Sequence, residues 1–221
     1  MKRLRLELKK DTDRSYDVLV GRGILAGLHS EVQRLGSFSS YGLVTDEVVR
    51  PLVAEQLQNQ LRSHSIDTTL IALPPGESAK TIETVLDLCQ QLLAQGFDRS
   101  SLLLAVGGGV VGDITGFAAA IYMRGISYIQ IPTTLLAQVD SSLGGKTGVD
   151  LPSGKNLLGA FHQPRLVLSD LDVLTSLSSD ARRDGFSEVI KAALIEDPEL
   201  FSVLEREGAD LLGTHNPHLE T

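Results

Sequence analysis

The feature that most constrains the fold of this 221-residue chain is a glycine-rich turn directly after a run of apolar residues. The run is Leu102–Val106, and the turn Gly107–Asp113 has the pattern G-x-G-x-x-G between a predicted strand and a predicted helix. Glycines let the backbone approach a pyrophosphate closely, and the helix start offers unpaired N–H groups and a positive dipole end. The turn therefore predicts a phosphate- and dinucleotide-binding site; a tight turn without a ligand is the alternative.

Short apolar runs alternate with helical periods on both sides of this turn. The predicted strands are 42–45, 66–73, 102–106 and 128–131, and the predicted helices are 48–61, 82–94 and 114–123. Apolar alternation at 4–8 and 16–20 adds two opening strands, for which an antiparallel edge pairing is one option. The fold class is therefore α/β, a Rossmann-like parallel sheet flanked by helices with an N-terminal β edge.

The charge is distributed unevenly along the chain. The net charge is -8, and residues 170–221 hold 12 acidic and 4 basic side chains, whereas acids and bases balance before them. Helical patterns at 171–174, 180–195 and 198–207 follow this shift. We predict an α/β domain over residues 1–169 and a short all-α fragment of a second domain over residues 170–221.

Composition argues against several classes of partner. An acidic chain lacks the basic face that nucleic acid requires, and no apolar stretch approaches the roughly 20 residues that span a bilayer. The first residues lack the apolar core of a signal peptide, so we expect a cytoplasmic protein. The single cysteine, Cys89, is expected to pack as a small apolar residue.

Polar side chains follow the predicted strands at the sheet edge where ligands collect in parallel α/β folds. Asp46 either binds a ribose or caps the next helix, and Glu77 and Lys80 either face the nucleotide or form a plain capping turn. Thr133 and Thr134 likewise suit ligand binding or capping. The strand at 127–131 ends without the acidic residue that binds the ribose in an ordinary Rossmann domain, so this contact must come from elsewhere.

The stretch 138–156 is polar and rich in glycine. It presents Lys146 and Lys155 from glycine-flanked loops, a cation pair suited to phosphate or carboxylate. Asp140 is suited to binding a hydroxyl or to proton transfer. A solvated surface loop is the alternative that composition leaves open.

These segments together closely resemble the 3-dehydroquinate synthase family. The resemblance is carried by Gly107–Asp113, Thr115–Ala120 with Met123-Arg124-Gly125, Pro132–Ser142, Gly144-Gly145-Lys146, and Gly154-Lys155-Asn156 with Phe161–Pro164. It implies an N-terminal α/β domain that binds NAD and a helical C-terminal domain that completes a divalent metal site, with zinc or cobalt.

The resemblance also implies roles for individual residues. The residues implied for NAD are Asp46, Glu77, Lys80, Gly108, Gly109, Val110, Val111, Gly112, Asp113, Thr133, Thr134 and Lys155. Asp140, Lys146 and Asn156 would hold the substrate, a seven-carbon keto-sugar acid phosphate. Arg124 would reach the substrate phosphate across a homodimer interface; its alternative role is to complement a helix C-terminus.

The last helical region resembles the family segment that supplies the first metal ligand, Glu188, and a substrate lysine, Lys191. Without the resemblance, this i, i+3 pair would be a surface ion pair. His215 and His218 have a tempting spacing, but their place at the chain end makes a frayed tail the expected reading.

The implied activity converts 3-deoxy-D-arabino-heptulosonate 7-phosphate to 3-dehydroquinate and phosphate, using NAD and a metal. The family's two histidine ligands and further substrate lysines lie beyond the point where this chain stops. We therefore expect a truncated chain with little activity alone. The alternatives are a related sugar phosphate cyclase and a non-catalytic NAD-binding fragment.

Overall fold

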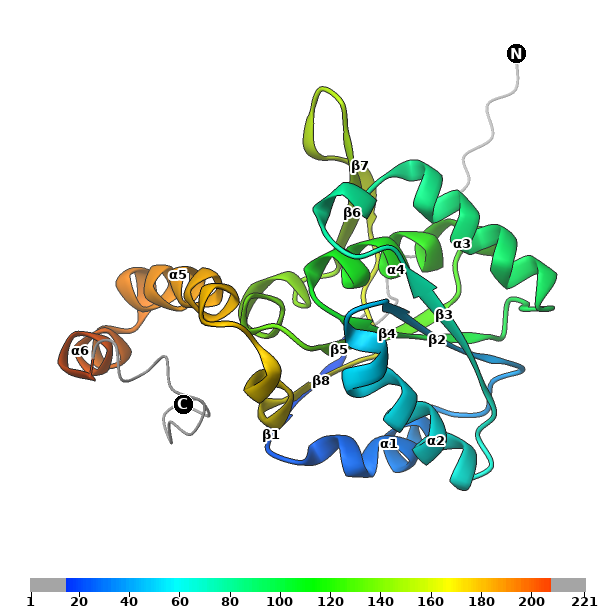
Figure 1. Ribbon diagram of the computed structural model, residues 1–221, viewed down its shortest axis with the longest axis horizontal. Coiled ribbons are helices and arrows are strands. Elements are labelled where there is room, and N and C mark those ends of the chain that lie inside the picture. Colours follow the sequence, from blue (N-terminus) through cyan, green and yellow to red (C-terminus); the bar gives the residue numbers. More distant parts are fainter. Residues whose placement is uncertain (1–14, 208–221) are drawn as a thin grey trace, which may run out of the picture.

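The computed structural model describes residues 15–207, in which a six-stranded parallel sheet forms the centre (Figure 1). The sheet order is β1-β8-β5-β4-β2-β3, and every neighbouring pair runs parallel. Its strands are β1 (Asp17–Gly21), β2 (Tyr41–Asp46), β3 (Thr68–Leu73), β4 (Leu102–Gly107), β5 (Ser127–Pro132) and β8 (Leu166–Asp170). A separate antiparallel hairpin consists of β6 (Lys146–Leu151) and β7 (Gly154–Phe161).

Helices cover both faces of the sheet (Figure 1). On one face, α1 (Leu28–Arg34) and α2 (Glu55–Ser63) pack against Leu102, Leu104 and Val106 of β4. On the other face, α3 (Ile82–Ala94) and α4 (Gly109–Ile121) pack against a cluster that includes Leu103. Because side chains alternate along a strand, the unbroken apolar run of β4 serves two cores at once.

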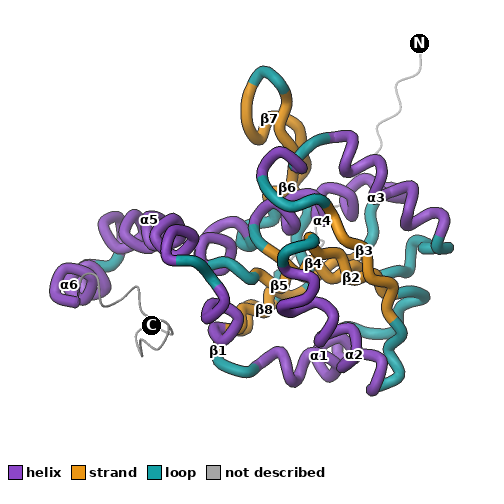
Figure 2. Tube along the Cα trace, in the orientation of Figure 1, coloured by secondary structure: helices purple, strands orange, loops and turns teal. Residues whose placement is uncertain are grey.

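Short helical segments connect these elements. They are η1 (Ile24–Gly27), η2 (Arg50–Ala54), η3 (Glu77–Ala79), η4 (Tyr122–Arg124), η5 (Ala137–Ser141) and η6 (Leu171–Ser176). After η6 the described chain continues only in helices, α5 (Ser179–Glu196) and α6 (Pro198–Glu207), which extend away from the sheet (Figure 2). Helix α6 buries none of its residues, as expected for a helix with no second layer against it among residues 15–207.

The four central strands and the helices predicted from periodicity are confirmed, with small shifts at their ends. Lys146 and Lys155, expected in glycine-flanked loops, lie in strands instead, because Lys146 begins β6 and Lys155 is the second residue of β7. Strand β8 and helix α1 were not predicted. The described part of the N-terminal edge, β1, pairs parallel with β8 rather than antiparallel, and the strand predicted at 4–8 lies outside the described residues.

Two smaller expectations are also answered. Cys89 is half-buried against the core, and burial raises the pKa of its thiol. Within residues 15–207, no helix combines the length and the apolar character needed to cross a membrane.

Candidate functional site

The glycine-rich turn lies at the point where the strand order reverses. From β2 the chain moves outward to β3, then returns to form β4 on the other side of β2. The carboxyl ends of β2 and β4 therefore border a crevice, the usual place for ligands in such sheets. Helix α4 starts directly after β4, with Gly108 as its N-cap and no capping side chain, so its first N–H groups face this crevice unblocked.

At three glycines of the turn, an added Cβ would come closer than 3.0 Å to a neighbouring side chain. At Gly107 it would lie 2.6 Å from Val111 Cβ, next to the backbone, so this position requires glycine. A Cβ built on Gly109 would lie 2.9 Å from Ser141 Oγ, and one on Gly112 would lie 2.7 Å from Gln130 Oε1, so these two side chains would have to move. The glycines therefore allow α4 to pack closely on the sheet and on η5 before any ligand is considered.

A cavity of about 550 Å³, here called the nucleotide cavity, opens above the turn. The predicted NAD residues that line it are Asp46, Gly108, Gly109, Val110, Val111, Thr133 and Thr134. They come from β2, the β4–α4 turn and the end of β5. Pro75 and Gly76 of the loop after β3 line the cavity as well, so all four loops that follow the predicted strands meet here. Gly112 does not line the cavity, and a Cβ there would face the Gln130 side chain, so its predicted NAD contact stays a prediction.

The polar side chains of this cavity divide into capping and free groups. Asp46 Oδ1 accepts hydrogen bonds from the backbone N–H groups of Val48 and Val49, both at 2.8 Å, so Asp46 caps a helix and lines the cavity as well. Thr134 Oγ1 accepts from the N–H of Ala137 at 3.2 Å. Thr133 Oγ1 is buried and has no partner among the described residues, which leaves it available to a ligand.

Several residues of the nucleotide cavity were missed by the sequence analysis. They are Val48, Val49, Leu52, Val53, Pro75, Gly76, Leu136, Ser176, Leu177, Ser178, Ala181 and Asp184. Those after residue 175 come from the end of η6, the link that follows it and α5, far from the glycine turn in sequence. Most of the missed residues are small or apolar, and Asp184 lies in no recognised motif, so only the fold reveals that they form the cavity wall.

A second cavity, of about 580 Å³ and here called the polar cavity, lies between α4, η5 and the β6–β7 hairpin. Asp113, Asp140, Lys146 and Asn156 all line it. Three of the residues that the resemblance assigns to the substrate, Asp140, Lys146 and Asn156, therefore share one cavity. Ser141, which also lines it, lies beside Gly109 of the nucleotide cavity, since a Cβ on Gly109 would be 2.9 Å from Ser141 Oγ. The two cavities therefore meet at the glycine turn.

Lys80 and Glu77 differ from expectation, because neither lines the nucleotide cavity. Lys80 is buried, and its Nζ lies 2.5 Å from Asp113 Oδ2 and 2.6 Å from Asn156 Oδ1. Glu77 Oε1 accepts from Lys155 Nζ at 3.0 Å. Both residues thus bind the wall of the polar cavity and the hairpin in this structure, and their predicted NAD contacts remain predictions.

Electrostatics in this wall are set by burial and pairing. Burial raises the pKa of the Asp113 carboxyl above its ordinary value, because desolvation outweighs the favourable contact with Lys80. At the exposed Lys155, the hydrogen bond with Glu77 raises the pKa of the ammonium group.

Arg124 lines neither cavity. It lies before β5, at the amino end of the sheet, opposite the strand ends that line the nucleotide cavity. Its turn is strained, because Met123, Arg124 and Gly125 have φ values of 48°, 69° and 120°. Non-glycine residues rarely adopt this conformation, and such strain is concentrated at functional sites.

Glu188 and Lys191 form an ion pair on α5, and hydrogen bonding with Glu188 raises the pKa of Lys191. No group of three or more His, Cys, Asp or Glu side chains suited to a metal occurs among residues 15–207. His215 and His218 lie outside the described residues. The surface ion pair predicted from spacing alone is confirmed, and the metal role of Glu188 stays a prediction.

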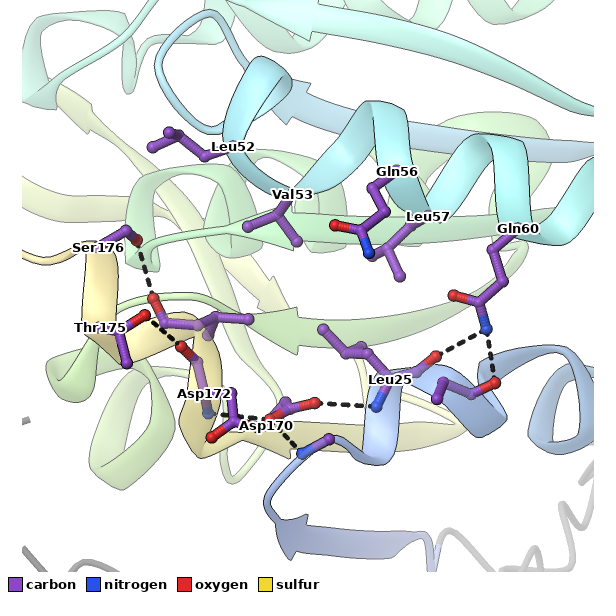
Figure 3. Close-up of a pocket in the computed structure, with 13 residues that line it drawn as sticks. Leu25, Leu52, Val53, Gln56, Leu57, Gln60, Asp170, Asp172, Thr175 and Ser176 are labelled. Carbon is purple, nitrogen blue, oxygen red and sulfur yellow. Dashed lines mark hydrogen bonds between the residues drawn. The ribbon is translucent and has the colours of Figure 1, made fainter. Parts of the chain in front are cut away.

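A further cavity of about 570 Å³ adjoins the nucleotide cavity and shares Leu52, Val53 and Ser176 with it (Figure 3). The buried Asp170 carboxylate accepts from the backbone N–H groups of Gly23 and Leu25, each at 3.0 Å. These bonds join the end of β8 to η1 and hold the start of η6. The position of Ser176 in the nucleotide cavity therefore depends on the hydrogen bonds of Asp170.

With this geometry established, comparison with known proteins is informative. The family model described as 3-dehydroquinate synthase N-terminal matches residues 70–184, just over half of the chain. The chain belongs to the 3-dehydroquinate synthase family. A relative named 3-dehydroquinate synthase from Paracoccus denitrificans is 49% identical over 198 residues, which cover 90% of this chain and 54% of the relative.

Solved structures extend the family relationship to sugar phosphate cyclases. The 2-epi-5-epi-valiolone synthase of Streptomyces hygroscopicus, with NAD+ and Zn2+ bound, is 38% identical with a TM-score of 0.85, covering 95% of this chain and 57% of that chain. A 2-deoxy-scyllo-inosose synthase bound to carbaglucose-6-phosphate, NAD+ and Co2+ is 32% identical with a TM-score of 0.76. The match covers 81% of this chain and 48% of that chain. The chain spans about half the length of the relatives it matches.

Proposed function

We propose that this chain provides the NAD-binding half of a 3-dehydroquinate synthase active site. The reaction would convert 3-deoxy-D-arabino-heptulosonate 7-phosphate to 3-dehydroquinate and phosphate, the work of a lyase that eliminates phosphate. The observation that carries the proposal is the meeting of two cavities at the glycine turn: Gly109 lines the nucleotide cavity, and Ser141 of the polar cavity lies so close that a Cβ on Gly109 would be 2.9 Å from its Oγ. A redox cofactor and its substrate need this adjacency.

The residues present fit NAD. The uncapped start of α4 suits the pyrophosphate, and the buried hydroxyl of Thr133 lacks a protein partner among the described residues. The 2-epi-5-epi-valiolone synthase structure, which shares this fold, contains NAD+. Asp46 keeps its second carboxylate oxygen for a ribose hydroxyl, because only Oδ1 is used in capping.

Bound NAD would supply a temporary hydride acceptor for a substrate hydroxyl and return the hydride later. The chain's own residues would orient the substrate beside it. Lys146 would bind phosphate or carboxylate oxygens by charge-assisted hydrogen bonds, and Asp140 would accept a hydrogen bond from a substrate hydroxyl. Asn156 would add amide donors from β7 of the hairpin. Holding these groups around one cavity lowers the entropic part of the barrier.

The described residues do not fit a divalent metal site. A metal of this kind needs at least three protein ligands, whereas Glu188 is paired with Lys191 and no suitable cluster occurs within residues 15–207. We retain Glu188 as a single proposed ligand for zinc or cobalt, with the others supplied from outside the described residues, and we assign no step to the metal.

Arg124 supports a homodimer in this proposal. Its place at the amino end of the sheet separates it from the nucleotide cavity of its own chain, so a second copy would have to receive it. The hairpin offers apolar surface for such a contact, because Leu157 and Phe161 are 61% and 74% exposed. The cytoplasmic location expected from the sequence also remains part of the proposal.

Calorimetric titration with NAD, followed by assay of phosphate release from 3-deoxy-D-arabino-heptulosonate 7-phosphate with NAD and zinc, tests this function. We expect this chain alone to bind NAD and to release phosphate only slowly. The absence of NAD binding would contradict the proposal, and release at enzyme-like rates would refute the expectation of an incomplete active site. Preferential release from glucose 6-phosphate, whose carbocyclic analogue occupies the 2-deoxy-scyllo-inosose synthase structure, would indicate a related cyclase instead.

A further inference from the structure

Lys80 lies at the centre of a buried network behind the polar cavity. The residue is only 6% exposed, and its ammonium group contacts the Asp113 carboxylate at 2.5 Å and the Asn156 amide oxygen at 2.6 Å. Asp113 and Asn156 line the polar cavity, whereas Lys80 lines neither that cavity nor the nucleotide cavity. Lys80 therefore acts on the cavity through two residues that a ligand would meet directly.

The contact with Lys80 fixes which way the Asn156 amide faces. A lysine ammonium is only a donor, so the Asn156 atom beside it must be the oxygen, and Nδ2 must point the other way. No acceptor for Nδ2 is found among the described residues. Because Asn156 lines the polar cavity, its two amide N–H groups are donors left for a ligand's phosphate, carboxylate or hydroxyl oxygens.

A β-bulge brings Asn156 to this position. The pairing of β6 with β7 is regular up to Val149 and shifts before Leu151, so three residues of β7 oppose the single residue Asp150. Asp150 Oδ1 accepts from the Asn156 N–H at 2.7 Å, and the Asp150 N–H donates to the Lys80 carbonyl at 2.9 Å. Asn156 has a φ of 56°, a conformation that asparagine tolerates better than most residues. Bulges commonly re-aim a side chain next to an active site.

We infer that Lys80 is a positioning residue for the substrate site, which orients the Asn156 amide so that its donors face the polar cavity. This inference rests on the proposed function, since it concerns the same site. It gives Lys80 a role distinct from the direct NAD contact that the family resemblance implies. Lys80 also follows Glu77, which pairs with Lys155 of the hairpin, so the segment 77–80 fastens the hairpin by its side chains and its backbone.

Two variants of Lys80 separate positioning from charge pairing. Lys80→Gln and Lys80→Met both remove the charge that faces Asp113, but only glutamine keeps an N–H donor for Asn156 Oδ1. A purely structural ion pair predicts equal effects for the two variants. Positioning predicts that Lys80→Met weakens substrate binding about tenfold, whereas Lys80→Gln stays within about threefold of the unaltered chain.

Calorimetric titration with 3-deoxy-D-arabino-heptulosonate 7-phosphate, in the presence of saturating NADH, gives these affinities, because NADH does not accept a hydride. NAD affinity, titrated separately, reports the direct contact that the resemblance implies for Lys80, and it should change equally in both variants because both lose the positive charge. Arg62→Met is a matched control, since it removes a positive charge from a half-exposed surface pair with Asp67. Equal losses of substrate affinity for Lys80→Met and Lys80→Gln would overturn the inference.

An NMR experiment tests the same relationship without any ligand. The chain has three asparagines, Asn59, Asn156 and Asn216, so selective 15N labelling gives three side-chain amide pairs. The Asn156 pair is identified by its loss in Asn156→Asp. It should shift in Lys80→Met and remain near its original position in Lys80→Gln; an unchanged signal in Lys80→Met would refute the contact.

Asn156→Asp also keeps the test valid if Lys80→Met does not fold. This exposed residue would still accept from Lys80 but would have lost both side-chain donors, so substrate affinity should fall about tenfold while NAD affinity is retained. Unchanged substrate affinity in Asn156→Asp would contradict the inference. If the unaltered chain binds neither NAD nor substrate, the proposed function fails, whereas the NMR result still decides whether Lys80 positions Asn156.

Discussion

At the scale of single residues, Asp46, Thr133 and Lys80 show how one side chain serves structure and site together. Asp46 caps the segment after β2 and lines the nucleotide cavity, so its two alternative roles are compatible. Thr133 has a buried hydroxyl with no partner among the described residues, which is costly unless a ligand satisfies it. Lys80 is a buried charge whose cost is offset by Asp113.

Gly108→Ala tests the phosphate-binding turn. The backbone at Gly108 has a φ of -73°, which alanine adopts readily, and the added Cβ would lie 3.1 Å from Thr134 Cγ2. We expect the variant to fold but to bind NAD about tenfold more weakly, a loss of about 1.4 kcal/mol, because the methyl group enters the nucleotide cavity. Calorimetric titration with NAD measures this.

Gly27→Ala serves as the control for Gly108→Ala, since a Cβ at Gly27 meets no atom within 4 Å. It should bind NAD like the unaltered chain. Equal NAD affinity in Gly108→Ala and Gly27→Ala would show that the cofactor backbone does not approach the turn.

The buried carboxyl group of Asp113 should make the stability of the chain depend on pH. Burial raises the pKa of its carboxyl in the folded chain above 3.8, so the folded state holds the proton more tightly than the unfolded state. The stability due to this group is fully present below pH 3.8 and is lost as the pH rises through the raised pKa. Denaturant unfolding across this pH range measures the free energy of unfolding of the unaltered chain and of Asp113→Asn. The value for the unaltered chain minus the value for Asp113→Asn should fall as the pH rises, and a rise would refute the assignment.

At the scale of secondary-structure elements, the site depends on how strand ends are joined to distant segments. Helix η6 contributes Ser176 to the nucleotide cavity although it follows the last strand of the sheet. Its position is set by Asp170, whose buried carboxylate accepts from Gly23, Leu25 and the N–H of Asp172 at 2.9 Å (Figure 3).

Asp170→Ala should therefore destabilise the fold. Three backbone N–H groups would lose their acceptor in a mostly buried corner, so we expect the free energy of unfolding to fall by about 2–4 kcal/mol. Asp172→Ala is the matched control: its side chain makes a half-exposed pair with Arg22, worth less than about 1 kcal/mol. Denaturant unfolding of both variants measures these changes. Equal losses in the free energy of unfolding would show that the hydrogen bonds of Asp170 do not stabilise this part of the fold.

At the scale of the whole molecule, Arg124 lies at the end of the sheet opposite the nucleotide cavity. If a second copy receives it, the chain must associate in solution. Sedimentation equilibrium should then give a dimer, and exchanging Phe161 for Asp on the exposed hairpin should shift the equilibrium toward monomer, because a buried charge weakens an apolar contact. A monomer at all concentrations would contradict the proposed role of Arg124 in this chain.

The sequence by itself determined the α/β class, the central strands and the glycine turn, because these depend on local periodicity and on backbone geometry that only glycine permits. Through motifs specific to one family, it also named the polar residues expected in the site, of which Asp46, Thr133, Asp140 and Lys146 line the two cavities. Strands β6 and β8 escaped prediction, because glycine and polar residues in β6 obscure its alternation and β8 is a short run whose partners are distant in sequence.

Only the tertiary structure decided which residues face one another. The nucleotide cavity takes part of its wall from η6, α5 and the link between them, whose residues belong to no motif that points to a nucleotide. Lys80 was predicted beside the nucleotide, yet the bulge opposite Asp150 brings Asn156 to it across 76 residues of sequence. Contacts of this kind follow from strand register and helix packing, which depend on the whole fold, so no local pattern in the sequence specifies them.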